Sequence, residues 1–100
     1  MSGSWTFLTN HAHVLLLVDE DPDLRLRDLA VAVGITERAA QRIMGELIED
    51  GYVTRQRVGR RNTYTVHPEI PLRHPLEQGH TVGDLLAAVR PDLGTLTNRT

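Results

Sequence analysis

The fold is decided by residues 24–66, which read LRLRDLAVAVGITERAAQRIMGELIEDGYVTRQRVGRRNTYTV. Gly34 follows a short apolar-periodic run, where glycine can take the left-handed conformation that caps a helix C-terminus without steric cost. Two residues later, Thr36 can accept a hydrogen bond from a free backbone N–H of the next helix, as N-cap residues do. Ile35 lies between them and is expected to point into the core. The three residues predict two helices joined by a tight turn, as in a helix-turn-helix.

The helix after this turn is predicted to run from Thr36 to Asp50 and to end at Gly51. Its apolar residues Ala40, Ile43, Met44 and Leu47 follow the spacing of one buried helical face. The opposite face carries Thr36, Glu37, Arg38, Gln41 and Arg42. Because arginine pairs with guanine and glutamine with adenine in the DNA major groove, this face is a candidate for base recognition. Taken alone, the pattern also fits the solvated side of an ordinary amphipathic helix.

Two β-forming runs follow, from Tyr52 to Val58 and from Asn62 to Val66, with a tight turn at Gly59 and Arg60. This hairpin carries no acidic residue, and its candidate DNA contacts are Arg55, Arg57, Arg60, Arg61 and Asn62. Four positive charges on a short hairpin suit a phosphate backbone. The alternative is an edge hairpin whose charges only prevent pairing with other chains, although mixed signs would serve that purpose equally well.

These stretches resemble the winged helix-turn-helix domains of small bacterial transcriptional regulators, broadly of the MarR and ArsR type. The resemblance covers about residues 8–68, and it rests on Leu29-Ala30, Gly34 through Arg38, Leu47 through Val53, and Arg57 through Tyr64. It implies a mainly α-helical fold with a small β-hairpin, in which residues 36–50 are the recognition helix and residues 55–62 the arginine-rich wing. It also implies a short extra strand at Leu24–Leu26 that joins the wing sheet.

Composition agrees with one small domain, since 100 residues with 40% hydrophobic side chains can bury one modest core. The chain has no cysteine, which excludes disulfides, thiol redox sensors and thiolate metal sites. The net charge of −2 is unevenly distributed, because the wing is purely basic while acids gather around the first loop at Asp19, Glu20, Asp21, Asp23 and Asp28. Phosphate contacts depend on such local patches, so the net charge does not argue against DNA.

The first part of the chain indicates a cytoplasmic protein that forms a homodimer. Val14–Val18 is far too short to span a membrane, and Met1–Ser4 lacks the basic start of a signal peptide. His11–Val18, with an N-cap at Thr9 or Asn10, is predicted to form a helix that is apolar nearly all round. Such a helix needs partners on both sides, and one of them could be a second copy of the chain.

The end of the chain adds a second predicted dimer element. Thr81 and Asp84 resemble a capping box, and a short apolar helix follows until Arg90-Pro91 ends it. This helix is too short to be stable alone and must dock on something. The predicted dimer residues from both ends are Trp5, Phe7, Leu8, Leu16, Leu17, Val82, Leu85, Leu86 and Val89. The alternative is that the end helix folds back on the first helix of its own subunit.

The chain therefore divides into a winged helix-turn-helix domain at residues 1–68 and a connector with a C-terminal helix at residues 69–100. Pro68, Pro71, Pro75 and Gly79 interrupt any regular pattern and predict an extended connector.

We expect neither catalysis nor a cofactor, because the chain has no nucleophile-elbow, phosphate-loop or dinucleotide-binding pattern. A sensor metal site across a dimer, built from His74 or His80 with Glu77 or Asp84, is geometrically possible in an ArsR-like protein. This spacing is generic, so we expect no metal. The predicted partners are double-stranded DNA and a second copy of the chain. The rival hypothesis is a winged-helix module that binds another protein without sequence-specific DNA binding.

Overall fold

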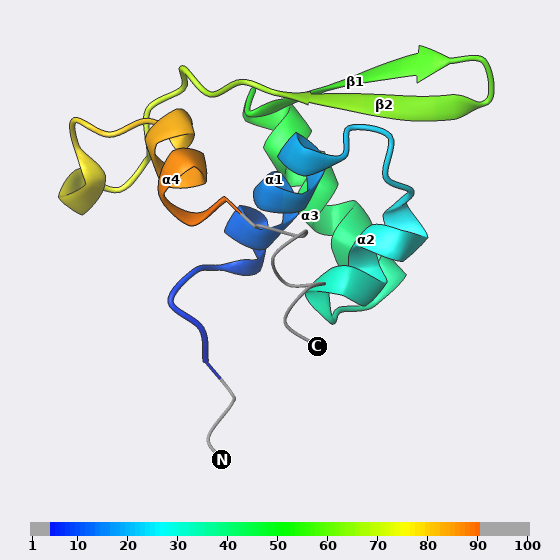
Figure 1. Cartoon of the computed structure of the whole chain (residues 1–100), viewed down its shortest axis with the longest axis horizontal. Helices are drawn as coiled ribbons and strands as arrows, with labels where there is room; N and C mark the ends of the chain where they lie inside the picture. The colour runs from blue at the N-terminus through cyan, green and yellow to red at the C-terminus, as the bar shows by residue number, and fades with distance from the viewer. Residues whose placement is uncertain (1–4, 91–100) are drawn as a thin grey trace.

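The computed structural model describes residues 5–90. In chain order their elements are α1 (Asn10–Glu20), α2 (Leu26–Val33), α3 (Glu37–Glu49), β1 (Val53–Val58), β2 (Arg61–Val66), the 3₁₀ helix η1 (Pro75–Glu77) and α4 (Val82–Val89). The α-helices gather around α1, and the hairpin extends away from them as a long arm (Figure 1). The architecture confirms a winged helix-turn-helix fold with an added C-terminal helix. Among the described residues, no helix has the length and apolar character needed to cross a membrane.

The helix-turn-helix forms as the sequence predicts. Gly34 has a φ of 89° and ends α2, with its N–H bonded to the carbonyl of Ala30 at 2.8 Å. Thr36 caps α3, because its hydroxyl accepts a hydrogen bond from the N–H of Ala39 at 3.0 Å. The predicted inner face of α3 is buried throughout, at Ala40, Ile43, Met44 and Leu47. Ile35 is half-buried against the same core.

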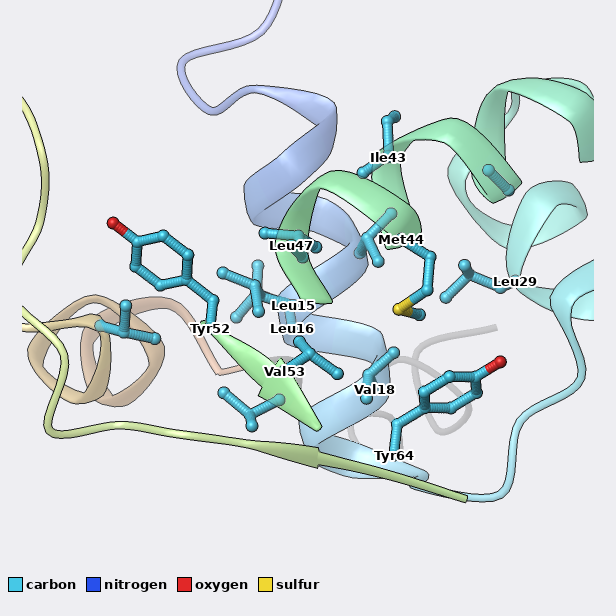
Figure 2. Close-up of a cluster of buried hydrophobic side chains, with 14 of the residues drawn as sticks. Leu15, Leu16, Val18, Leu29, Ile43, Met44, Leu47, Tyr52, Val53 and Tyr64 are labelled. Carbon is cyan, nitrogen blue, oxygen red and sulfur yellow. The ribbon is translucent and has the colours of Figure 1, made fainter. Parts of the chain in front are cut away.

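The wing is a two-stranded antiparallel hairpin that pairs Val53 with Val66 at its base and Val58 with Arg61 at its tip. Gly59 has a φ of 62°, which a tight turn requires here and glycine adopts without strain. Tyr52, just before β1, and Tyr64 on β2 anchor the base of the wing in the hydrophobic core (Figure 2). The tip is exposed, so the outer half of the hairpin is free of the helices.

The predicted strand at Leu24–Leu26 is wrong. Within residues 5–90 the sheet has two strands, and this segment instead leads into α2, which begins at Leu26. The one backbone hydrogen bond to the wing comes from the loop before this segment, where the carbonyl of Pro22 accepts from the N–H of Tyr64 at 2.9 Å. Proline has no N–H to donate, and the chain turns away immediately afterwards, since the N–H of Leu24 bonds back to the carbonyl of Asp21 at 3.1 Å.

The prediction of an extended connector after the wing is also wrong. It folds back on itself, with an isolated bridge between Pro71 and Thr81 and the turn of η1 between them. Its backbone bonds the start of α4, because the N–H of Val82 donates to the carbonyl of Ile70 at 2.9 Å. The proline pattern therefore marks a compact loop whose hydrogen bonds are made across the fold-back.

Helix α4 packs on α1 of its own chain. Thr81 and Asp84 form the predicted capping box, with the N–H of Asp84 donating to the Thr81 hydroxyl at 3.2 Å. The N–H of Thr81 donates to the Asp84 carboxylate and holds the pKa of that group below its ordinary value. At its other end, Arg90 contacts Asp19 at 3.1 Å and Glu20 at 3.0 Å on α1. The end helix is thus joined to α1 by apolar contacts and by ion pairs within one chain.

Candidate nucleic-acid interface

The outer face of α3 presents all five predicted recognition residues to solvent. Thr36, Glu37, Arg38, Gln41 and Arg42 are exposed, while the inner face is buried. Because Thr36 caps the helix, the free backbone N–H groups of its first turn lie at the same end as these side chains, where the helix dipole favours negative ligands. This end of α3 therefore combines donor side chains with a positive helix terminus.

A groove of about 540 Å³ separates the N-terminal half of α3 from the wing. We call it the basic groove and define it by its polar lining, which comprises Asp23, Arg25, Arg27, Glu37, Gln41, Arg55, Arg60, Arg61 and Asn62. Five arginines therefore face two carboxylates. The groove joins candidate base-contacting residues on the helix to candidate phosphate-contacting residues on the wing in one concave surface.

Two of the groove's arginines, Arg25 and Arg27, lie at the start of α2 and were missed by sequence reasoning. Arg25 is the residue before α2, and its Nε lies 3.6 Å from Asp28 in an exposed pair. The sequence did not mark these two arginines as a basic patch, because the acids of the first loop surround them along the chain. In the fold both arginines line the groove beside the wing, although Arg25 stays close to Asp28 and Asp23 lines the same groove.

Four predicted residues lie outside the lining of the groove: Thr36, which caps α3, and Arg38, Arg42 and Arg57. Arg57 donates through Nε to the carbonyl of Gly59 at 3.1 Å, which supports the wing turn. Arg42 pairs with Glu46 one helical turn later, with Nη1 and Oε2 3.4 Å apart. Arg38 is exposed on α3 but does not line the groove. Within the described part of the chain, the concave surface is thus centred on Gln41 and the arginines around it.

The predicted dimer residues divide into two groups. Leu16, Val82 and Leu86 are buried in the core of their own chain, so a partner is not needed to cover them. The other six remain at least partly accessible: Trp5, Phe7, Leu8, Leu17, Leu85 and Val89. Trp5 and Phe7 form an edge-to-face aromatic pair with ring centres 5.0 Å apart, although Trp5 is 65% and Phe7 92% exposed. An exposed aromatic pair of this kind is the strongest remaining sign of a partner surface.

The histidines considered for a metal site are used in local contacts. The ring of His74 accepts a hydrogen bond from the N–H of Leu76, and the N–H of His74 donates to Glu77 at 3.1 Å. His80, which precedes the N-cap of α4, lies 3.6 Å from Asp84 in the first turn of that helix. Among residues 5–90 no group of three metal-binding side chains comes together.

A sequence profile of the MarR family matches residues 6–61, which include α1, the helix-turn-helix and most of the wing. The chain belongs to the MarR family. Proteins of the MarR family are transcriptional regulators and not enzymes, so the resemblance drawn from the sequence is confirmed and catalysis is not its function.

Two solved MarR-family structures are similar to this one. The first is Rv2887, a MarR-family protein of Mycobacterium tuberculosis, in complex with salicylic acid. It is 18% identical to this chain, the match covers 92% of this chain and 73% of that chain, and the TM-score is 0.52. The second is the zinc-dependent regulator AdcR in its Zn(II)-bound state, with 16% identity, 99% and 74% coverage, and a TM-score of 0.48. The first likeness supports the fold. A search of curated proteins found no match.

Proposed function

We propose that this MarR-family regulator binds double-stranded DNA in a sequence-specific manner, with α3 in the major groove and the wing along the phosphate backbone. The observation that carries the proposal is the basic groove, in which five arginines gather beside the exposed face of α3. An arginine-lined concave surface next to a helix of suitable width matches the electrostatic and geometric needs of a duplex.

The residues divide by role. Arg38 and Gln41 lie on the N-terminal half of α3 and are the candidates for contacts with base edges. The wing arginines and Asn62 contact phosphates, which fixes the orientation of α3 but reads little sequence. Arg25 and Arg27 extend the phosphate surface to the start of α2. The interface therefore spans three elements that are far apart in the sequence.

The active form in this proposal is a homodimer in the cytoplasm. One domain offers few base contacts, whereas two recognition helices about 34–36 Å apart read successive major grooves of a palindromic site. The accessible apolar residues at the chain's two ends, above all Trp5 and Phe7, supply the surface between subunits. Sedimentation equilibrium at micromolar concentration should return twice the chain mass of 11.2 kDa, and a single species at that chain mass would refute the dimer.

Fluorescence anisotropy against pooled DNA from the protein's own promoter region tests the DNA proposal. We expect selective binding that weakens with a steep log–log dependence on salt concentration. Arg60→Ala/Arg61→Ala should lower the affinity by roughly tenfold, since both side chains line the basic groove. A matched control is Arg73→Ala/Arg90→Ala, which removes the same charge from exposed ion pairs elsewhere.

The outcomes separate the two hypotheses about this fold. A loss of affinity confined to the wing variant supports the proposal and implicates the basic groove. Equal losses of DNA affinity in the wing variant and its control would show that only the net charge of the protein matters. The basic groove would then not be the DNA-binding surface. No selective binding at low salt would reject DNA recognition and favour the protein-interaction module.

A further inference from the structure

A second cavity of about 530 Å³ lies at the other end of α3, away from the basic groove. Its walls come from the segment before α1, from α1 itself, from the C-terminal end of α3, from the connector and from α4. A cavity of this volume is within the range that holds a drug-sized molecule. None of the DNA contacts proposed above uses this cavity, so its chemistry can be considered separately.

The floor of the cavity is apolar, with Leu8, Ala12, Leu15, Leu47, Val82 and Leu85 among its residues. Two aromatic side chains, Phe7 and Tyr52, also line it. Leu15, Leu47 and Tyr52 lie close together in the close-up of the core, with the hydroxyl of Tyr52 directed out of the cluster (Figure 2). This lining favours a ligand with a hydrophobic body, because apolar area is removed from water on binding.

The charged residues of the lining are mostly acidic, and we call the hollow the acidic cavity. Glu46, Asp50 and Glu77 contribute three carboxylates, whereas Arg73 is the one guanidinium in the lining. Arg73 is already paired with Asp50 at 2.9 Å. The remaining two carboxylates therefore determine the sign of charge that the cavity prefers.

Those two carboxylates differ in how far they are compensated. Glu46 accepts a hydrogen bond from His11 at 2.7 Å and lies 3.4 Å from Arg42. The bond from His11, with a smaller contribution from the charge of Arg42, holds the pKa of Glu46 below its ordinary value, so this group is ionised at neutral pH. Glu77 accepts a hydrogen bond from the backbone N–H of His74 at 3.1 Å. Within residues 5–90, Glu77 forms no ion pair.

We propose that the acidic cavity binds an amphipathic organic cation, with its apolar body on the leucine floor and its positive charge near Glu46 and Glu77. Phe7 and Tyr52 add favourable contacts, because the faces of aromatic rings attract cations. An anion of the same shape would meet two carboxylates, while the one guanidinium in the lining, that of Arg73, is already paired with Asp50. This site does not depend on DNA binding. Phe7, Leu8 and Leu85 of its lining also belong to the apolar surface proposed between subunits, so each titration is read beside the oligomeric state given by sedimentation equilibrium.

Two probes of matched shape and opposite charge test the sign of the preference. Tetraphenylphosphonium and tetraphenylborate are titrated into the full chain by isothermal calorimetry, without DNA. Trp5 is the only tryptophan in the sequence and its ring centre lies 5.0 Å from that of Phe7, so its fluorescence provides a second readout at the cavity wall. We expect saturable binding of one cation per chain and at least roughly tenfold weaker binding of the anion.

Charge-neutralising variants locate the site. Glu46→Gln/Glu77→Gln should weaken binding of the cation by about tenfold while leaving the apolar floor intact. The matched control is Glu49→Gln/Glu69→Gln, which removes the same charge from two exposed residues outside the lining. Circular dichroism melting of each variant verifies that it is folded before the titration.

Each alternative result overturns the proposal. Equal affinity for the two probes would show an apolar site without charge preference. Equal weakening in both double variants would show attraction to the overall charge of the protein. No saturable binding of the cation by folded wild-type protein would show that the cavity does not accept this class of ligand.

Discussion

Two hollows of similar volume, about 540 Å³ and 530 Å³, lie along one helix and have opposite chemistry. The N-terminal part of α3 supplies Glu37 and Gln41 to the basic groove, and its C-terminal end supplies Glu46 and Asp50 to the acidic cavity. The groove gathers five arginines, whereas the cavity gathers three carboxylates over an apolar floor. One secondary-structure element therefore takes part in two surfaces that would select ligands of opposite charge.

The net charge of −2 therefore describes neither surface, because the groove's lining holds five arginines and two carboxylates while the cavity's lining holds one arginine and three carboxylates. The two tyrosines near the base of the wing are also divided between these surfaces. Tyr64 lines the groove, and Tyr52 lines the cavity. Their hydroxyls point to opposite ends of the hydrophobic cluster (Figure 2). Local potentials decide which ligand approaches which surface, because charges beyond about 8–10 Å are largely screened in physiological salt.

The largest expected effect comes from loosening the helix that the two hollows share. Ile43→Ala removes a side chain that is 2% exposed on the inner face of α3, and it should lower the free energy of unfolding by about 2–5 kcal/mol. Chemical denaturation measures this change. Val31→Ala on α2 is the control, since that side chain is 76% exposed and its loss should cost at most about 0.5 kcal/mol. Similar costs for the two variants would contradict the burial of α3.

A second change should separate the two surfaces. Arg25→Ala/Arg27→Ala removes the groove's arginines at the start of α2, so the slope of log affinity for DNA against log salt should decrease by about 2. Binding of tetraphenylphosphonium in the acidic cavity should stay the same, because neither side chain lines it. Salt-dependent anisotropy and calorimetry give the two readouts. An unchanged salt slope would remove both residues from the interface.

A third pair of changes compares the helix caps. Thr36 caps α3 and Thr81 caps α4, each accepting a backbone hydrogen bond, at 3.0 Å and 3.2 Å. Thr36→Ala and Thr81→Ala should each lower the free energy of unfolding by about 1 kcal/mol. Only Thr36→Ala should also weaken DNA binding, because that cap orders the exposed end of α3. If anisotropy showed an equal loss of DNA affinity for Thr36→Ala and Thr81→Ala, the cap of α3 would have no special role in DNA binding.

The smallest effect concerns the ion pair between α1 and α3. The pKa of Glu46 is lowered below its ordinary value of 4.5, chiefly by the hydrogen bond from His11. A lowered pKa in the folded state gives stability that is present above the unfolded value and is lost as pH falls through the folded value. Glu46→Gln should therefore reduce Tm slightly at neutral pH, and the gap to wild type should close as pH falls below about 4.5.

Thermal melts at about pH 5.5 and at about pH 3 measure that gap, which is small because both side chains are roughly half exposed. Glu49→Gln, which removes a carboxylate from the same helix end without touching His11 or Arg42, is the matched control. A gap for Glu46→Gln that persists at the lower pH would show that the ion pair does not contribute as the structure implies.

The sequence was sufficient to predict the helix-turn-helix and the wing because their signals are local. Gly34 and Thr36 mark the turn by backbone conformation and capping, and the spacing of residues 40–47 marks the buried face. Alternating β-formers around Gly59 likewise define the hairpin without help from distant residues. The recognition face followed from the same periodicity, since the residues opposite a buried stripe must be exposed.

The features that were missed depend on contacts between distant segments. Leu24–Leu26 failed to form a strand because the backbone turns into α2 after one bond to the wing. Arg25 and Arg27 belong to the groove only because the fold brings the start of α2 next to the wing, which no local pattern in the sequence shows. Leu16 was assigned to a dimer because an all-apolar helix has no visible inner face in the sequence, and the structure covers that residue within the chain.

The backbone hydrogen bond from Tyr64 to Pro22, beside which the Thr63 hydroxyl donates to the same carbonyl at 3.5 Å, also bears on how the wing can move. The N–H of Tyr64 is fixed to the loop after α1, while the strand continues outward for three more residues to Arg61. With about 3.3 Å per residue, the tip of the hairpin projects roughly 10 Å beyond this backbone hydrogen bond at Tyr64. In the proposed DNA complex the tip would bend to follow a wider or narrower groove while α3 keeps its position. Amide exchange should accordingly be slow at Tyr64 and faster toward the tip.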